Sequence, residues 1–148
     1  MLNFLPHWLI GALSMSLLIL NVVFWVFILL FFSFLKFLLP AAFLRRRIDQ
    51  ILLWIAENWI AGNVQWMNLT QKTAWDVQGN EGLDYRGWYL VVSNHQSWAD
   101  IFVLQKLLNR RIPLMKFFLK RELIWVPLMG LAWWALDFPF LRRHSTEY

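Results

Sequence analysis

Residues 88–100 read WYLVVSNHQSWAD, and this stretch decides the fold that we expect. Its first five residues are apolar and β-prone, which predicts a strand buried on both faces. Ser97 then offers a helix N-cap, and residues 98–108 follow the spacing of a helix. The inward-facing positions of that helix are predicted to be Ile101, Leu104, Leu107 and Leu108. A strand that runs directly into a helix is typical of an α/β domain.

The flanking residues continue this alternation of strands and helices. Three more strands are predicted, over residues 74–78, 112–119 and 138–141. A helix is predicted over residues 121–136, around Pro127 and Gly130. The fold class is therefore predicted as α/β.

The turn between the strand and the helix carries His95 and, five residues later, Asp100. On a regular helix this spacing would separate the two side chains by ~140°. If His95 lies in the turn, however, Asp100 in the first helical turn can reach its ring. A carboxylate on one imidazole nitrogen makes the other nitrogen a better general base for a hydroxyl. The alternative is structural, with His95 as a turn residue and Asp100 as a first-turn helix carboxylate.

Upstream of the predicted domain, residues 48–69 predict an amphipathic helix. Its apolar positions recur at helical spacing and are Ile48, Ile51, Leu52, Ile55 and Trp59. Several tryptophans lie nearby, and tryptophan favours the membrane interface. The helix can therefore lie on a membrane or pack against the domain.

The N-terminus is far more apolar than the rest of the chain. Residues 8–32 read WLIGALSMSLLILNVVFWVFILLFF, and residues 1–35 contain no Lys, Arg, Asp or Glu. This run exceeds the ~20 apolar residues that a membrane helix needs. Pro40 is expected to end or kink the helix. A single span and a bent hairpin within one leaflet are both compatible with this pattern.

Three arginines, at positions 45–47, follow the apolar run directly. A basic cluster beside a membrane span marks its cytoplasmic side, so the later residues are expected to face the cytoplasm. We therefore predict a membrane anchor over residues 1–47 and a domain over residues 48–148.

The composition excludes several classes of protein. Of the 148 residues, 59% are hydrophobic and 16% are charged, which excludes a disordered chain and argues against an ordinary soluble globule. The chain has no cysteine, so disulfides, thiolate metal sites and cysteine nucleophiles are excluded. His7 and His144 have no partner at ligand spacing, and no metal site is predicted.

The formal net charge is +5, and six cations lie between Asp100 and Glu122 without an acid. They are Lys106, Arg110, Arg111, Lys116, Lys120 and Arg121. This block can meet anionic lipid or the phosphates of an acyl donor, or it can be a solvated face. Nucleic acid is not an expected partner, because the apolar anchor holds the chain at a membrane.

The sequence Asn-His-x-x-x-x-Asp at residues 94–100, behind an N-terminal anchor, resembles the lysophospholipid acyltransferase family. A second similar block begins with KRELIWVPLMG at residues 120–130 and ends in GLAWWALDFPFLRR at residues 130–143. The resemblance implies that His95 is the catalytic base and that Asp100 orients it. It also implies that Arg143, with Arg142 beside it, binds the acceptor phosphate, and that no cofactor is needed.

The resemblance implies an O-acyltransferase of phospholipid synthesis or remodelling. The donor would be acyl-CoA or acyl-carrier protein, and the acceptor a lysophospholipid such as 1-acylglycerol-3-phosphate. The expected location is the bacterial inner membrane, with the domain facing the cytoplasm. The family's third block, Glu-Gly-Thr-Arg, does not occur in this sequence, so a domain incomplete at its C-terminus is expected. The alternative is a catalytically inactive membrane protein of the same fold, either a remnant or an interaction partner.

Overall fold

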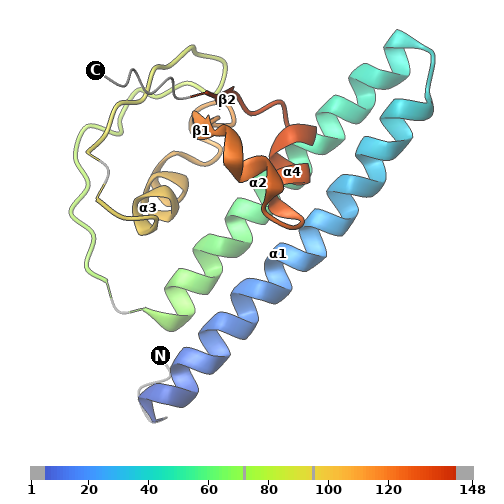
Figure 1. The fold of residues 1–148 in the computed structure, drawn as a ribbon. Helices are drawn as coiled ribbons and strands as arrows, with labels where there is room; N and C mark the ends of the chain where they lie inside the picture. Colours follow the sequence, from blue (N-terminus) through green and yellow to red (C-terminus); the bar gives the residue numbers. More distant parts are fainter. Residues whose placement is uncertain (1–5, 72, 95, 143–148) are drawn as a thin grey trace, which may run out of the picture. The chain divides into compact units, whose positions relative to one another are not determined.

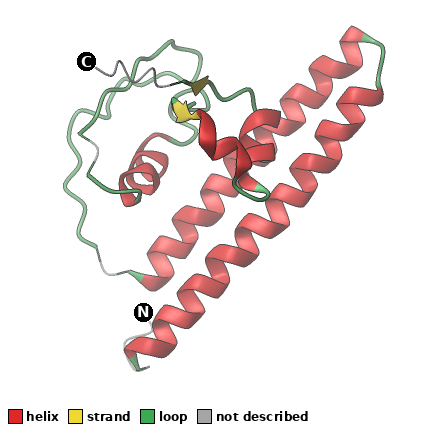
Figure 2. Cartoon of the chain, viewed as in Figure 1, coloured by secondary structure: helices red, strands yellow, loops and turns green. Residues whose placement is uncertain are grey.

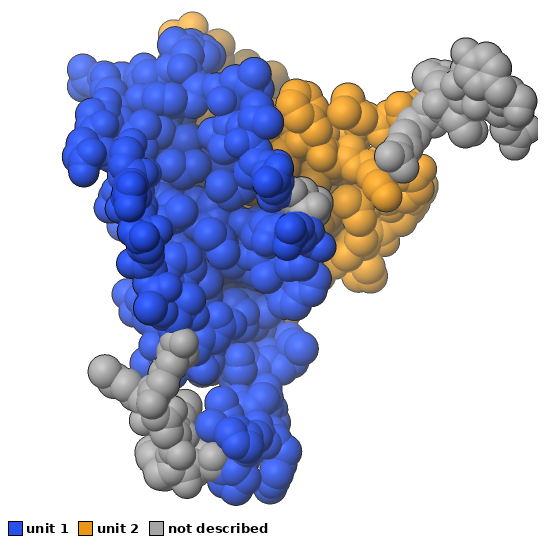
Figure 3. Space-filling model, turned by 90° about the vertical axis from the view of Figure 1, so that its left-hand side faces the viewer, with its two compact units in different colours: residues 1–22, 57–115 blue, residues 23–56, 116–148 orange. Residues whose placement is uncertain are grey.

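A computed structural model describes residues 6–71, 73–94 and 96–142. The chain divides into two compact units (Figure 3). Unit 1 comprises residues 1–22 and 57–115, and unit 2 comprises residues 23–56 and 116–148. The described residues are mostly helical, with two very short strands near the C-terminal end (Figure 1).

The apolar N-terminal segment forms helix α1 (His7–Leu38), as predicted. The helix begins after Pro6, whose carbonyl accepts the N–H groups of Leu9 and Ile10, and it ends shortly before Pro40. Among the described residues, α1 is the one helix long and apolar enough to cross a membrane by length and composition. Proline therefore marks both ends of this helix, since its ring fits a helical first turn but not a helix interior.

Helix α2 (Ala42–Thr70) contains the predicted amphipathic helix and begins six residues earlier than expected. The early start follows from Ala41, whose carbonyl accepts the N–H groups of Leu44 and Arg45. The apolar positions are buried where the spacing predicts it, at Ile48, Leu52, Ile55 and Trp59, whereas Ile51 stays 37% exposed. The predicted division at residue 47 falls inside this helix and stays a prediction.

Within unit 2, the end of α1 lies beside the start of α2. The rings of Trp25 and Trp54 meet edge to face at 6.0 Å. Lys36 forms an ion pair with Asp49, and Arg45 Nε donates to the Leu39 carbonyl at 2.7 Å. The short connection at residues 39–41 therefore joins two helices that pack against each other.

Two predicted strands are not formed. Residues 74–78 and 88–92 lie in the loops and turns between α2 and α3, drawn green in Figure 2. The second segment is not buried either, since Trp88, Leu90 and Val92 are 100%, 83% and 85% exposed. A β-prone run becomes a strand only where a neighbour pairs with its backbone groups, and no other described segment does so. The prediction of a strand buried on both faces is wrong for the described structure.

The short sheet lies in unit 2. Strand β1 (Leu119–Lys120) pairs in parallel with β2 (Phe140–Leu141). The 3-10 helix η1 (Arg121–Trp125) and helix α4 (Met129–Ala135) connect them, so the predicted helix over residues 121–136 is divided in two. Among the described residues, the predicted alternation of strands and helices is found only in this segment, from β1 to β2. Of the predicted strand over residues 112–119, only Leu119 lies in a strand, and Ile112 forms an isolated bridge with Asn109.

Gly130 allows η1 and α4 to approach each other closely. Its N–H donates to the Val126 carbonyl at 2.9 Å. A Cβ atom at this position would overlap the backbone carbonyl of Ile124. Only glycine therefore fits this turn without a shift of the backbone.

Candidate active site

The predicted motif leads into helix α3 (Ala99–Leu108), which lies in unit 1. Asp100 is in the first turn of this helix and is half-buried. Its Oδ2 atom accepts the backbone N–H groups of Gln96 and Ser97, at 2.7 and 2.9 Å. Charge-assisted bonds of this kind are roughly twice as strong as neutral ones. The carboxylate therefore fixes the turn that precedes the helix.

The helix start differs from the prediction by one residue. The N-cap position is Trp98, not Ser97, and the Trp98 side chain makes no capping bond. Ser97 nevertheless helps to satisfy the helix start, because its Oγ accepts the N–H of Ala99 at 3.1 Å. The Asp100 carboxylate has a different role, because the two N–H groups that it accepts belong to the turn before the helix.

The other predicted site residues are only partly described. His95 and Arg143 lie outside the described residues, and their proposed roles stay predictions. Arg142 is exposed and follows β2 directly in unit 2, whereas Asp100 belongs to unit 1. Within the described ranges no group of three His, Cys, Asp or Glu side chains could hold a metal ion.

Helix α3 is held on the second half of α2 by polar contacts that the sequence analysis did not identify. Asn63 Nδ2 donates to Gln105 Oε1 at 3.2 Å, and Asn109 Nδ2 donates to the Glu57 carbonyl at 3.1 Å. Near the helix start, the rings of Trp66 and Phe102 lie 5.4 Å apart. Positions 102, 105 and 109 share one face of α3, so the helix that carries Asp100 is fixed along this face.

The same network extends into α1. Asn21 Nδ2 donates to Asn63 Oδ1 at 3.0 Å and to the Trp59 carbonyl at 3.1 Å. A Cβ atom at Gly62 would overlap the Asn21 amide, so the glycine makes room for these bonds. Asn21, a polar residue that interrupts an otherwise apolar run, was a sequence signal for this network.

A buried carboxylate holds part of the loop before the motif. Glu57 is only 9% exposed, and its Oε1 accepts the Tyr85 hydroxyl at 2.5 Å. Arg110 Nε lies 3.9 Å from Glu57 Oε2. The hydrogen bond to Glu57, with burial, raises the pKa of Tyr85 to about 12.

We expect this bond to appear in an alkaline titration. Because the pKa of Tyr85 is raised above 10, its contribution to stability is complete below pH 10 and is lost as the pH rises from 10 to about 12. The tyrosinate absorbance that Tyr85→Phe removes should therefore titrate near pH 12. In Glu57→Gln the carboxylate is gone, and the same component should titrate closer to pH 10. If Tyr85→Phe removes only absorbance that titrates near pH 10, the bond is absent.

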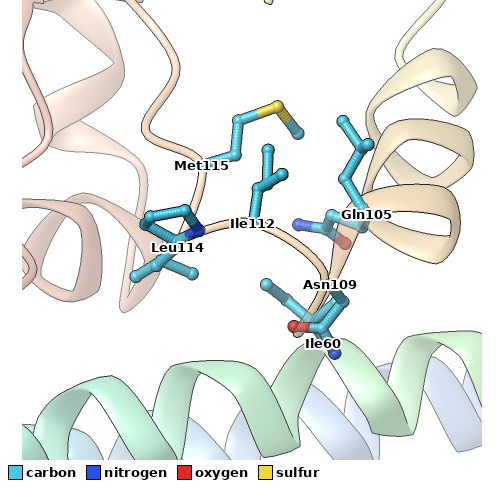
Figure 4. Close-up of a pocket in the computed structure, with 8 residues that line it drawn as sticks. Ile60, Gln105, Asn109, Ile112, Leu114 and Met115 are labelled. Carbon is cyan, nitrogen blue, oxygen red and sulfur yellow. The ribbon is translucent and has the colours of Figure 1, made fainter. Parts of the chain in front are cut away.

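One cavity beside α3 is too small to hold a substrate. It is lined by side chains of α2, α3 and the chain after α3, including Ile60, Gln105 and Ile112 (Figure 4). Its volume of about 10 Å³ is close to the least that a single water molecule needs. This region therefore serves packing, and larger cavities occur near the start of α3 and beside Lys106.

Comparisons with known proteins agree with the motif. The model of the family described as Acyltransferase matches residues 74–148. The chain is 41% identical over 59 residues to 1-acyl-sn-glycerol-3-phosphate acyltransferase alpha of Mus musculus and of Homo sapiens. This match covers 39% of the chain and 19% of each relative, so the chain spans about a fifth of their length. No solved structure matches.

The matched segment contains the Asp100 turn, α3 and the strand–helix–strand unit. It covers half of the chain and includes both sequence blocks that predicted the family. The predicted family is confirmed, and the chain belongs to the Acyltransferase family.

Proposed function

We propose that this chain is a membrane-bound O-acyltransferase. It would transfer a fatty acyl group from acyl-CoA or acyl-carrier protein to a lysophospholipid such as 1-acylglycerol-3-phosphate. The observation that carries the proposal is the Asp100 turn, in which the carboxylate accepts two backbone N–H groups at the start of α3. A carboxylate fixed in this way can orient a neighbouring imidazole without moving itself.

The proposed step needs no nucleophile from the protein. His95 takes the proton of the acceptor hydroxyl while that oxygen attacks the thioester carbonyl carbon. The C–S bond then breaks, and the proton from His95 passes to the leaving thiolate. Arg143 and Arg142 would bind the acceptor phosphate, because arginine forms paired hydrogen bonds with phosphate oxygens.

The membrane is the proposed location because the substrates are lipids and α1 exposes a stripe of large apolar side chains. The stripe follows a spacing of three and four residues and comprises Leu13, Leu17, Leu20, Phe24, Phe27, Phe31 and Phe34. Arginines 45–47 are exposed and favour the cytoplasmic side. The bacterial inner membrane stays a prediction from the short anchor.

Thiol release from an acyl-CoA tests the proposal. Membranes that hold the chain should release thiol only when lysophosphatidate is present, because the acceptor hydroxyl is the attacking group. Release that does not depend on the acceptor would indicate hydrolysis instead. If neither acyl-CoA nor acyl-carrier protein supports transfer, the proposed activity is wrong for this chain.

A second candidate function rests on the exposed segment at residues 88–92. Its backbone has no strand partner among the described residues, and three of its apolar side chains are more than four-fifths exposed. An extended segment of this kind can pair with a strand of another protein. An inactive chain that co-purifies with a complete acyltransferase would favour this role as an interaction partner.

A further inference from the structure

Two cavities lie along helix α3 in unit 1, and Trp75 lines both of them. The first is near the start of the helix, has a volume of about 120 Å³ and is mainly apolar. Its walls include Trp66, Met67, Trp98, Phe102 and Val103. This apolar pocket therefore adjoins the turn that Asp100 fixes.

The second cavity is an open cleft of about 440 Å³ beside the end of α3. It is lined by Trp75, Val77, Glu81, Lys106, Leu107 and Arg111, among others. Its volume falls within the range of roughly 300–1,000 Å³ that is usual for ligand sites. Two cations and one carboxylate give the cleft a net positive charge, which favours an anionic ligand.

One of the two cationic side chains of the cleft is held in position by contacts of its own. Lys106 Nζ lies 4.2 Å from the centre of the Trp75 ring and donates to Asn68 Oδ1 at 2.7 Å. Arg110 adopts a left-handed φ of 62° and ends the helix, and the N–H of Arg111 donates to the Leu108 carbonyl. This turn sets where Arg111 leaves the helix. Lysine and arginine together are well suited to bind phosphate.

We propose that the apolar pocket and the cationic cleft together form the binding site for the acyl donor, a phosphorylated thioester of the acyl-CoA class. The inference rests on the proposed function. The pocket would hold the apolar part of the donor near the Asp100 turn, and Lys106 with Arg111 would bind its phosphate.

The distance between Asp100 and Lys106 along the helix favours the acyl donor, rather than the acceptor, as the ligand of the two cavities. Lys106 follows Asp100 by six residues, which is about 9 Å along the helix axis. In a lysophospholipid such as 1-acylglycerol-3-phosphate, only a few bonds separate the phosphate from the reacting hydroxyl. In an acyl-CoA, a long flexible arm separates the phosphates from the thioester. The donor therefore spans the two places more readily than the acceptor does.

Binding of unacylated CoA to the full chain in detergent micelles tests the site without requiring turnover. Calorimetric titration should detect binding to the wild-type chain. Arg111→Gln should weaken it about tenfold, because it removes a charge-assisted hydrogen bond to phosphate. The matched control is Arg86→Gln, which changes an exposed arginine of the same unit outside both cavities. This control should leave CoA binding unchanged.

Two further measurements test whether the cleft binds the phosphate of CoA or that of a lipid headgroup. Trp75→Leu should also weaken CoA binding, since Trp75 lines both cavities. Vesicles of phosphatidylglycerol should bind wild type and Arg111→Gln equally. If Arg111→Gln lowers vesicle binding and leaves CoA binding unchanged, the cleft is a lipid headgroup site and the proposal is wrong.

The experiments distinguish failure of the proposed donor site from failure of the proposed acyltransferase activity. Acyl transfer with no effect of Arg111→Gln on CoA binding overturns the donor site and leaves the activity standing. CoA binding that depends on Arg111, in a chain without acyl transfer, supports the site and contradicts the activity.

Discussion

Replacement of His95 by alanine should lower acyl transfer by roughly 100- to 10,000-fold, the usual contribution of a general base. Without the imidazole, nothing in the proposed mechanism takes the proton of the acceptor hydroxyl. Thiol release from acyl-CoA in the presence of lysophosphatidate measures the effect. CoA binding is the control and should be unchanged, because the two donor cavities are lined by other residues. Transfer at the wild-type rate would show that another group acts as the base.

Asp100 can be separated into its two roles by two substitutions. Asp100→Ala removes the acceptor of the Gln96 and Ser97 N–H groups, so it disturbs the turn as well as the chemistry. Asp100→Asn keeps an oxygen for the turn but loses the negative charge. If Asp100 orients His95, Asp100→Asn should still transfer the acyl group slowly. The acidic side of its pH–rate profile should also move to lower pH, because the imidazole loses a neighbouring negative charge. A wild-type rate and pH profile in Asp100→Asn would restrict Asp100 to a structural role.

Replacement of Gly130 by alanine should destabilise unit 2 by about 3 kcal/mol, the upper end of the usual overpacking penalty. The added methyl group would overlap the Ile124 carbonyl, which belongs to the backbone and cannot rotate away as a side chain would. The measurement is the denaturant midpoint of the chain in detergent micelles, followed by circular dichroism.

The matched control is Gly11→Ala, which adds the same methyl group to helix α1. A Cβ atom there has no neighbour within 4 Å, and alanine favours a helix more than glycine does. Gly11→Ala should therefore be neutral or slightly stabilising. Equal midpoints for Gly130→Ala and wild type would show that the close approach between η1 and α4 is absent.

The helices could be predicted because their signals are local. Helix α1 follows from a long, mainly apolar run that ends before Pro40, and α3 follows from the spacing of its leucines and isoleucine. The bounds were less accurate, as at Ala42 and Trp98, because the sequence pattern does not fix which backbone groups make the first helical hydrogen bonds.

The strands could not be predicted from local pattern alone. Residues 88–92 have the composition of a buried strand, yet Trp88 is fully exposed. β-propensity measures how well a side chain fits a paired surface, and that surface depends on distant residues. Among the described residues, the one ladder pairs Leu119–Lys120 with Phe140–Leu141 across a helical connection.

The candidate site, too, could be predicted only where the signal in the sequence is local. The Asn-His-x-x-x-x-Asp pattern gave the family and placed Asp100 in the first helical turn, which the structure confirms. The contacts that hold α3 on α2 join residues about 40 or more positions apart, such as Asn63 and Gln105. Such pairs become visible only in three dimensions, although the asparagines on α2 were a weak signal.

Two polar groups in the first half of α1 bond to α2 and constrain where the chain tolerates insertions. Trp66 Nε1 donates to the Ser14 hydroxyl at 2.9 Å, and Asn21 bonds to Asn63. Ser14 and Asn21 are seven residues apart, close to two full turns, so both face the same neighbour. One added residue between them would rotate one group by about 100° away from its partner. A one-residue insertion between Ser14 and Asn21 is therefore expected to break one of these two contacts.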